Sequence, residues 1–109
     1  MVDQEKKNRL EQEFAGNFAS VLFPDLVDLY IEEGNYKRAR TVCEIGLSYH
    51  PENRQGLLLL AQVAMGEKDL EGAEKLLEAL LMLDEGNYQA THLLVTIQER
   101  LNRPPERCA

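Results

Sequence analysis

Apolar residues recur along the chain at helical spacings, and this pattern predicts a series of short amphipathic helices. Helix-forming residues dominate, and no stretch alternates apolar and polar residues in the way that a half-buried strand does. The chain is therefore predicted to be all-α. We expect its helices over residues 3–14, 21–33, 36–49, 54–66, 70–83 and 88–101.

Residues that favour turns and caps separate the first expected helices. Ser20 is expected to cap the helix that begins at residue 21, and Pro24 is tolerable because it lies in the first turn. Gly34 and Asn35 end that helix, since both accept left-handed or turn conformations. Pro51 ends the next helix, because the residue before a proline disfavours the helical region.

A period of 34 residues relates the two central helix pairs. Shifted by that period, Ala39 falls on Ala73 and Leu26 falls on Leu60. A small residue that returns at one place, surrounded by apolar residues at helical spacings, indicates an array of structural repeats.

Residues 20–53 and 54–87 resemble two consecutive tetratricopeptide repeats, and residues 88–101 resemble the first helix of a third repeat or a capping helix. The family places large apolar, small and aromatic residues at fixed positions of each repeat. In the first repeat these positions hold Phe23, Leu26, Val27, Tyr30, Tyr36, Ala39 and Pro51. In the second they hold Leu57, Leu60, Ala61, Ala64, Leu70, Ala73 and Glu85. Val27, Ala64 and Glu85 depart mildly from the family pattern, and Gly46 is smaller than Leu80 at the matching position. The resemblance implies a short right-handed α-solenoid of helical hairpins.

The alanines have a steric role in this scheme. Ala39 and Ala73 let the second helix of each pair approach the first closely, and Ala61 does the same for the neighbouring pair. We divide the chain into a charged helix and linker (1–19), a repeat domain (20–101) and an unstructured tail (102–109).

The last expected helix carries Leu93, Leu94 and Ile97, which nothing downstream is expected to cover. Each hairpin of a repeat array leaves an apolar face that its neighbour buries, so the ends of an array need caps. A second copy of the chain, or the remainder of a longer repeat protein, would supply the missing cover.

In tetratricopeptide repeat proteins the first helices of the hairpins line a concave groove. The resemblance implies a partner-binding groove here, made of Asp28, Ile31, Leu58, Gln62, Met65, His92 and Thr96. This surface would be apolar in the middle and polar at its edge, which suits an amphipathic helix or an extended peptide. The alternative is that Leu58 and Met65 pack against neighbouring helices as core residues.

One ligand class of the family can be tested residue by residue. Receptors of the carboxylate-clamp kind hold the C-terminal carboxylate of a chaperone tail with Lys and Asn on the first groove helix and Asn on the second. The matching residues here are Pro24, Asp28 and Leu59, and none fits. We do not expect an acidic chaperone tail as the ligand.

The net charge is −7, and residues 67–85 hold seven carboxylates against two lysines. Such a surface argues against nucleic acid, which binds clustered Lys and Arg. No apolar run is long enough to span a bilayer, and the N-terminal residues lack the apolar region of a signal peptide. We expect a cytoplasmic protein without nucleic-acid or membrane partners.

The sequence holds no constellation that predicts catalysis, a cofactor or a metal ion. His50 and His92 have no Cys, Asp or second His at ligand spacing, and Cys43 and Cys108 lie far apart. Phosphate-binding loops and nucleophile motifs are likewise missing. We interpret the chain as a non-catalytic interaction module that binds a protein or peptide. The rival interpretation is a structural domain that self-associates into a homo-oligomer.

Overall fold

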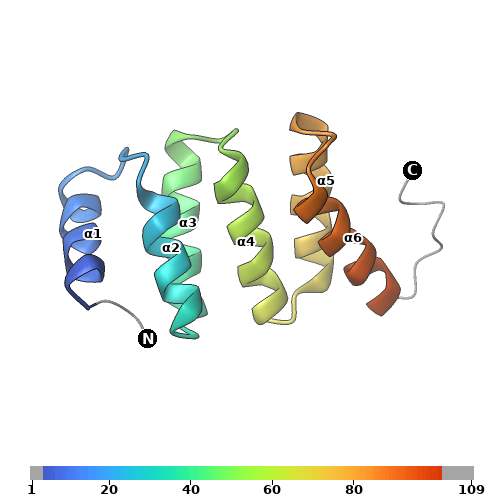
Figure 1. Ribbon diagram of the computed structural model, residues 1–109, viewed down its shortest axis with the longest axis horizontal. Helices are drawn as coiled ribbons and strands as arrows, with labels where there is room; N and C mark the ends of the chain where they lie inside the picture. The colour runs from blue at the N-terminus through green and yellow to red at the C-terminus, as the bar shows by residue number, and fades with distance from the viewer. Residues whose placement is uncertain (1–3, 102–109) are drawn as a thin grey trace.

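The computed structural model describes residues 4–101, and within them the chain folds into six α-helices. The molecule is elongated, with extents of 45 × 26 × 19 Å (Figure 1). The all-α prediction is confirmed, whereas the expected tail at 102–109 lies outside the described residues. The helices are α1 (Gln4–Gly16), α2 (Phe23–Glu32), α3 (Tyr36–Tyr49), α4 (Arg54–Gly66), α5 (Leu70–Leu83) and α6 (Tyr88–Arg100).

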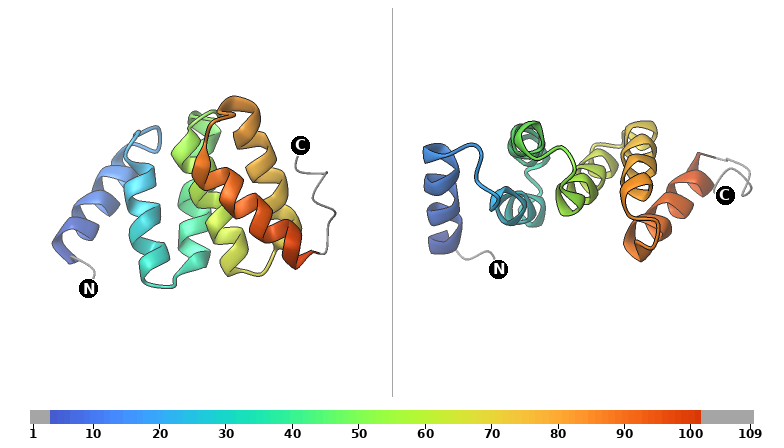
Figure 2. Two further views of the ribbon diagram at one scale, coloured as in Figure 1. Left: turned by 45° about the vertical axis from the view of Figure 1, so that its right-hand side comes forward. Right: turned by 90° about the horizontal axis from the view of Figure 1, so that it is seen from above.

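The helices stack in chain order as antiparallel hairpins. Seen from above, α2, α4 and α6 lie on one side of the stack, and α3 and α5 lie on the other (Figure 2). Each helix packs on its neighbours in the sequence, and α4 also contacts α2. The first helices of successive hairpins therefore share one side of the molecule, which we call the groove face.

Asparagine and aspartate side chains cap α3, α4, α5 and α6. In each case the side-chain oxygen accepts a hydrogen bond from the backbone N–H three residues later, as between Asn53 and Gly56 at 2.8 Å. Each such cap stabilises a helix by about 1 kcal/mol. The 34-residue period therefore covers helix starts as well as core positions. The capping residues are Asn35, Asn53, Asp69 and Asn87.

The start of α2 has no such side-chain cap, and the prediction that Ser20 caps this helix is wrong. The helix begins at Phe23, and Leu22 stands at the N-cap position without a side-chain bond. The Ser20 hydroxyl accepts a hydrogen bond from the Leu22 N–H at 3.2 Å, within the connecting segment. Pro24 stabilises this late start, because its fixed φ suits the first turn.

Ala19 occupies the place that Asn53 and Asn87 hold in the later hairpins, 34 residues along. An alanine cannot cap a helix, and its carbonyl instead accepts a hydrogen bond from His50 Nε2 at 2.7 Å. The His50 ring is stacked on the Phe23 ring, with centroids 6.2 Å apart. The segment before α2 is thus fixed by contacts with the end of α3.

The turn that follows the first helix of each hairpin contains a residue in the left-handed region. Gly34 has φ of 74°, as expected, and Lys68 has φ of 66° at the matching place. In both turns the next N–H bonds to a carbonyl of the preceding helix, from Asn35 to Tyr30 and from Asp69 to Ala64. The two turns share one geometry although only one has the glycine that favours it.

The core consists of two clusters of buried side chains. The first joins α1, α2, α3 and α4, and the second joins α4, α5 and α6. Of the expected structural positions, Leu26, Tyr30, Ala39, Leu60, Ala61 and Ala73 are buried, and Tyr36 and Leu70 are half-buried. Pro51 lies exposed in the turn between α3 and α4. The predicted core is confirmed.

Phe23 packs into a slot made of two glycines. A Cβ atom on Gly46 would lie 2.2 Å from the Phe23 ring, and one on Gly56 would lie 2.8 Å from it. Because real carbon atoms do not approach so closely, any side chain at Gly46 would displace the ring. The small residue at position 46 is therefore a packing requirement.

The apolar side chains of the last helix, α6, are more buried than expected. Leu94 and Ile97 are 4% and 0% exposed, in the second core cluster, and Leu93 is half-buried. Gln98 is also buried, and its Nε2 donates to Glu74 Oε2 of α5 at 3.4 Å. The expectation that Leu94 and Ile97 require cover is wrong, because α5 already provides it. Val95, 39% exposed, is the large apolar residue of α6 that points outward beyond the first turn.

Candidate partner-binding groove

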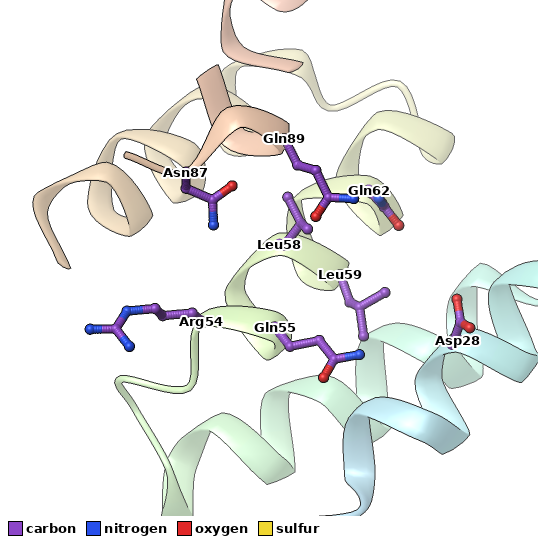
Figure 3. A pocket seen from close by; sticks show the side chains of 8 residues that line it. All are labelled: Asp28, Arg54, Gln55, Leu58, Leu59, Gln62, Asn87 and Gln89. Carbon is purple, nitrogen blue, oxygen red and sulfur yellow. The ribbon is translucent and has the colours of Figure 1, made fainter. Parts of the chain in front are cut away.

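A cavity of about 380 Å³ opens on the groove face (Figure 3). Its residues come from α2, from α4, and from the start of α6 with the cap that precedes it. All three first helices therefore contribute to a single site. The lining residues are Asp28, Arg54, Gln55, Leu58, Leu59, Gln62, Asn87 and Gln89.

The structure brings together three of the seven predicted groove residues. Asp28, Leu58 and Gln62 line the cavity. The other four lie outside its lining: Ile31, Met65, His92 and Thr96. Ile31 packs against the first core cluster and Met65 against the second. The Thr96 hydroxyl donates to the His92 backbone carbonyl at 3.0 Å, and the His92 side chain is exposed.

Of the three residues expected to form an apolar, partly exposed centre, Leu58 is buried, whereas Ile31 and Met65 are half-buried. Leu58 is only 8% exposed and belongs to the second core cluster, while Leu59 is 5% exposed and belongs to the first. Both leucines lie beneath the cavity and support it from the core. Of the two sequence interpretations of Leu58, the structure favours the core.

Carboxamide side chains dominate the walls instead. Gln55 and Gln62 are two turns apart on α4, and Gln89 lies on α6 across from them (Figure 3). Within residues 4–101 these three carboxamides form no hydrogen bond with another residue. Asn87 differs, because it caps Ala90 at 2.9 Å and also donates to an Asp84 carboxylate oxygen at 3.3 Å. Three unpaired amide groups therefore face the cavity.

Five residues that line the cavity are absent from the expected groove set: Arg54, Gln55, Leu59, Asn87 and Gln89. The period gives a usable signal for Asn87, which falls 34 residues after the cap Asn53. The family register places Leu59 at a clamp position, but its apolar side chain gave no reason to include it among the expected groove residues.

The charged residues are distributed unevenly around the cavity. Asp28 is an exposed carboxylate on the α2 wall. Arg54 extends away from Asp28 and from the glutamines (Figure 3), and its guanidinium donates to the Leu83 carbonyl at 3.4 Å. The centre of the cavity is therefore neutral, and its α2 wall is acidic.

A second polar cluster fixes α1 to the groove helices. The Tyr30 hydroxyl donates to the Glu11 carboxylate, and Arg38 lies 3.8 Å from the same carboxylate. Burial, together with Glu11, raises the pKa of Tyr30 to about 12. Lys7 and Glu33 add an ion pair at 2.8 Å. These groups hold α1 against α2, so the cluster has a structural role.

In the part of the chain that the structure describes, no group of three or more His, Cys, Asp or Glu residues could hold a metal ion. Cys43 is fully buried, and its burial raises the thiol pKa to about 12. No helix over residues 4–101 is long and apolar enough to cross a membrane.

The fold and the site define a class: a short helical-repeat protein whose successive first helices line one groove. The tetratricopeptide repeat family model matches residues 30–96, which is more than half of the chain. The chain belongs to the tetratricopeptide repeat family. Its six described helices correspond to two repeats with a flanking helix on each side.

Two curated proteins are similar in sequence. Human protein O-mannosyl-transferase TMTC3 is 34% identical over 95 residues, which is 84% of this chain and 10% of that protein. The TPR repeat-containing protein YpiA of Bacillus subtilis (strain 168) is 29% identical over 89 residues, or 82% of this chain and 21% of that protein. The chain thus spans only a small part of the length of these relatives.

Two solved structures share the fold. The first TPR of Spaghetti (RPAP3), bound to the HSP90 peptide SRMEEVD, has a TM-score of 0.84 at 18% identity and covers 88% of this chain and 77% of that chain. The second TPR domain of human RPAP3, in complex with the HSP70 peptide SGPTIEEVD, has a TM-score of 0.78 at 20% identity and covers 84% and 78%. At these identities the likeness establishes the fold.

Proposed function

We propose that this chain is a non-catalytic protein-interaction module that binds an extended segment of a partner protein in the groove between α2, α4 and α6. The observation that carries the proposal is the cavity itself. It is lined by all three first helices, and its walls present the unpaired carboxamides of Gln55, Gln62 and Gln89.

The chemistry of these walls suits a peptide backbone. A carboxamide has two donors and one acceptor, so it can pair with both the N–H and the C=O of an extended chain. A peptide that lies along the cavity would satisfy these groups, while its side chains would contact Leu58 and Leu59 at the base. Backbone pairing would give affinity, and the base of the groove would select side chains.

The similar structures support the general class of ligand, because two of them hold peptides. Those peptides end in Glu-Glu-Val-Asp, and this chain lacks the residues that its family uses for such tails. Pro24, Asp28 and Leu59 stand at the clamp positions. Pro24 and Leu59 are buried apolar residues, and Asp28 would repel a carboxylate. We therefore do not expect this chain to bind an acidic chaperone tail.

Selection from a library of random dodecapeptides tests the proposal. We expect the wild type to enrich peptides that the double variant Gln62→Ala/Gln89→Ala no longer retains. The matched control is Gln4→Ala/Gln12→Ala, which removes two exposed glutamines of α1, away from the groove. Equal retention by both double variants would contradict the proposed groove, provided that both melt at the wild-type temperature.

Self-association is a second candidate, and one observation favours it. Large apolar side chains are exposed where the α1–α2, α3–α4 and α5–α6 connections gather, at the upper edge in Figure 1. Tyr88 is 90% exposed, Met82 85% and Val21 65%. Exposed apolar groups concentrated at one edge favour a protein contact.

Sedimentation velocity at increasing concentration distinguishes the two candidates. A self-associating protein would sediment faster as its concentration rises, and Met82→Ser/Tyr88→Ser would abolish the change. We expect the wild type to sediment at one concentration-independent rate if the groove is its principal binding site.

A further inference from the structure

We propose that the groove selects a positively charged segment of its partner, one whose Lys or Arg side chain pairs with Asp28. This inference rests on the proposed function and narrows its ligand class. It is carried by the distribution of charge around the cavity, which differs from wall to wall.

Asp28, the α2 residue that lines the cavity, lies on an acidic face of its helix. Asp25, Asp28 and Glu32 are spaced by three and four residues, so they share one face of the helix, and all three are exposed. Within residues 4–101 none of them forms an ion pair. Three basic residues of α1 and α3 form ion pairs with other carboxylates: Lys7 with Glu33, Arg38 with Glu11, and Arg40 with Glu44 and Glu67.

The opposite walls do not neutralise this charge. Gln55, Gln62 and Gln89 are neutral, and Arg54 points away from Asp28 to bond with the Leu83 carbonyl at 3.4 Å (Figure 3). Asp28 is therefore the carboxylate that lines the cavity, and Arg54, the other charged residue of the lining, bonds to a carbonyl instead. A partner without positive charge would leave this carboxylate unpaired and partly desolvated, which is unfavourable.

The apolar base complements a basic side chain as well. Leu59 lies between Gln55 and Asp28 in Figure 3, and its side chain lines the cavity. The methylene stem of a Lys or Arg can lie over an apolar residue while its charged end reaches a carboxylate. The net charge of −7 also attracts a basic segment over longer distances and accelerates its association.

The composition of selected peptides tests the inference first. The dodecapeptides enriched by the wild type should carry net positive charge, with Lys or Arg at a recurring position. An enriched set that is neutral or acidic would overturn this inference and leave the proposed groove standing. Failure to enrich any peptide would count against the proposed function as a whole, and with it against this narrower claim.

Binding of one enriched peptide to charge variants is the second test, measured by fluorescence anisotropy. We expect Asp28→Asn to weaken binding about two- to fivefold and Asp28→Lys to weaken it about tenfold or more. The matched control Glu78→Gln removes one exposed carboxylate of α5, on the other side of the stack, and should change affinity less than twofold.

Ionic strength separates pairing at Asp28 from general attraction. Wild-type affinity should fall as ionic strength rises from about 0.05 to about 0.3 M, and the slope should be smaller for Asp28→Asn than for Glu78→Gln. If Asp28→Asn and Glu78→Gln lost affinity equally, only net charge would matter. That result would overturn the pairing of Asp28 with a basic side chain of the partner. The melting temperature of each variant is compared with that of the wild type, so that a folding defect is distinguished from a loss of affinity.

Discussion

The hairpin α2–α3 of the first repeat and the hairpin α4–α5 of the second share one arrangement but distribute side-chain volume differently. The first repeat places Phe23 opposite Gly46, and the second has Leu57 and Leu80 at the matching positions. The Phe23 ring occupies the space that a side chain at Gly46 would need, whereas Leu80 is fully buried in the second core cluster. A large and a small residue in one repeat thus replace two of intermediate size in the other.

This difference shows what the repeat constrains. Core packing fixes the combined volume at a contact more strongly than the identity of either residue. By contrast, the close helix crossings at Ala39 and Ala73 are the same in both repeats, and each alanine is 0% exposed. Space at the crossings is limited by two backbones, so a neighbouring side chain cannot compensate there.

Gly46→Leu should have the largest effect, because its Cβ alone would lie 2.2 Å from the Phe23 ring. Overpacking of a well-packed core costs about 1–3 kcal/mol and sometimes more, and we expect the upper end here. The double variant Phe23→Leu/Gly46→Leu reproduces the pair of the second repeat. It should recover part of the loss, with a coupling of about 1–3 kcal/mol in denaturant unfolding. Additive effects would contradict volume compensation.

Ala39→Leu and Ala73→Leu should each lower the free energy of unfolding by about 1–3 kcal/mol. The two losses should be similar, because both residues lie at the same crossing of their hairpins. Circular dichroism melts would measure them, with the exposed Ala79→Leu on α5 as the matched control. An unchanged midpoint for either variant would mean that the assigned repeat register is wrong.

Alkaline pH should weaken the first repeat through Tyr30, whose place in the second repeat is held by Ala64. The pKa of Tyr30 is raised from 10 to about 12, so its stabilising contribution is fully present below pH 10 and is lost as the pH rises toward 12. The loss is at most about 1.4 kcal/mol per pH unit across that window. Tyr30→Phe should show a shallower decline, and an identical pH dependence of the two proteins would exclude this role for Tyr30.

Lys68→Gly should raise stability by about 1 kcal/mol, the smallest of these effects. Lys68 adopts φ of 66°, where glycine carries no steric cost, as at Gly34 in the first repeat. Lys75→Gly in the middle of α5 is the matched control, and it should lower stability by about 1 kcal/mol. Thermal melts of both would test the turn geometry. A loss of stability in Lys68→Gly would contradict it.

Periodicity was sufficient to predict the helices, their pairing and most of the core, because burial repeats with the helical turn. It failed at the start of α2, where Ser20 looks like a cap but bonds within the preceding segment. That segment is bonded to the end of α3 through His50 and Ala19, a long-range contact that a local pattern does not reveal.

The site was predicted less well than the fold. The repeat register placed the groove on the first helices but left open whether Leu58 is a surface or a core residue, and the packing of α5 and α6 buries it. Within the leucine run of α4 a small rotation of the helix decides which side chain faces the groove. Asp28 and Gln62 were predicted from the groove positions that the family resemblance implies, and both line the cavity.

The central proposal is that α2, α4 and α6 form the binding surface. Titration of isotopically labelled protein with an enriched peptide, followed by NMR chemical shifts, tests it directly. We expect the largest chemical-shift changes at Asp28, Gln55, Gln62 and Gln89, with little change on the outer side of α3 and α5. Shifts concentrated at Tyr49, Met82 and Tyr88, along the exposed apolar edge, would contradict it.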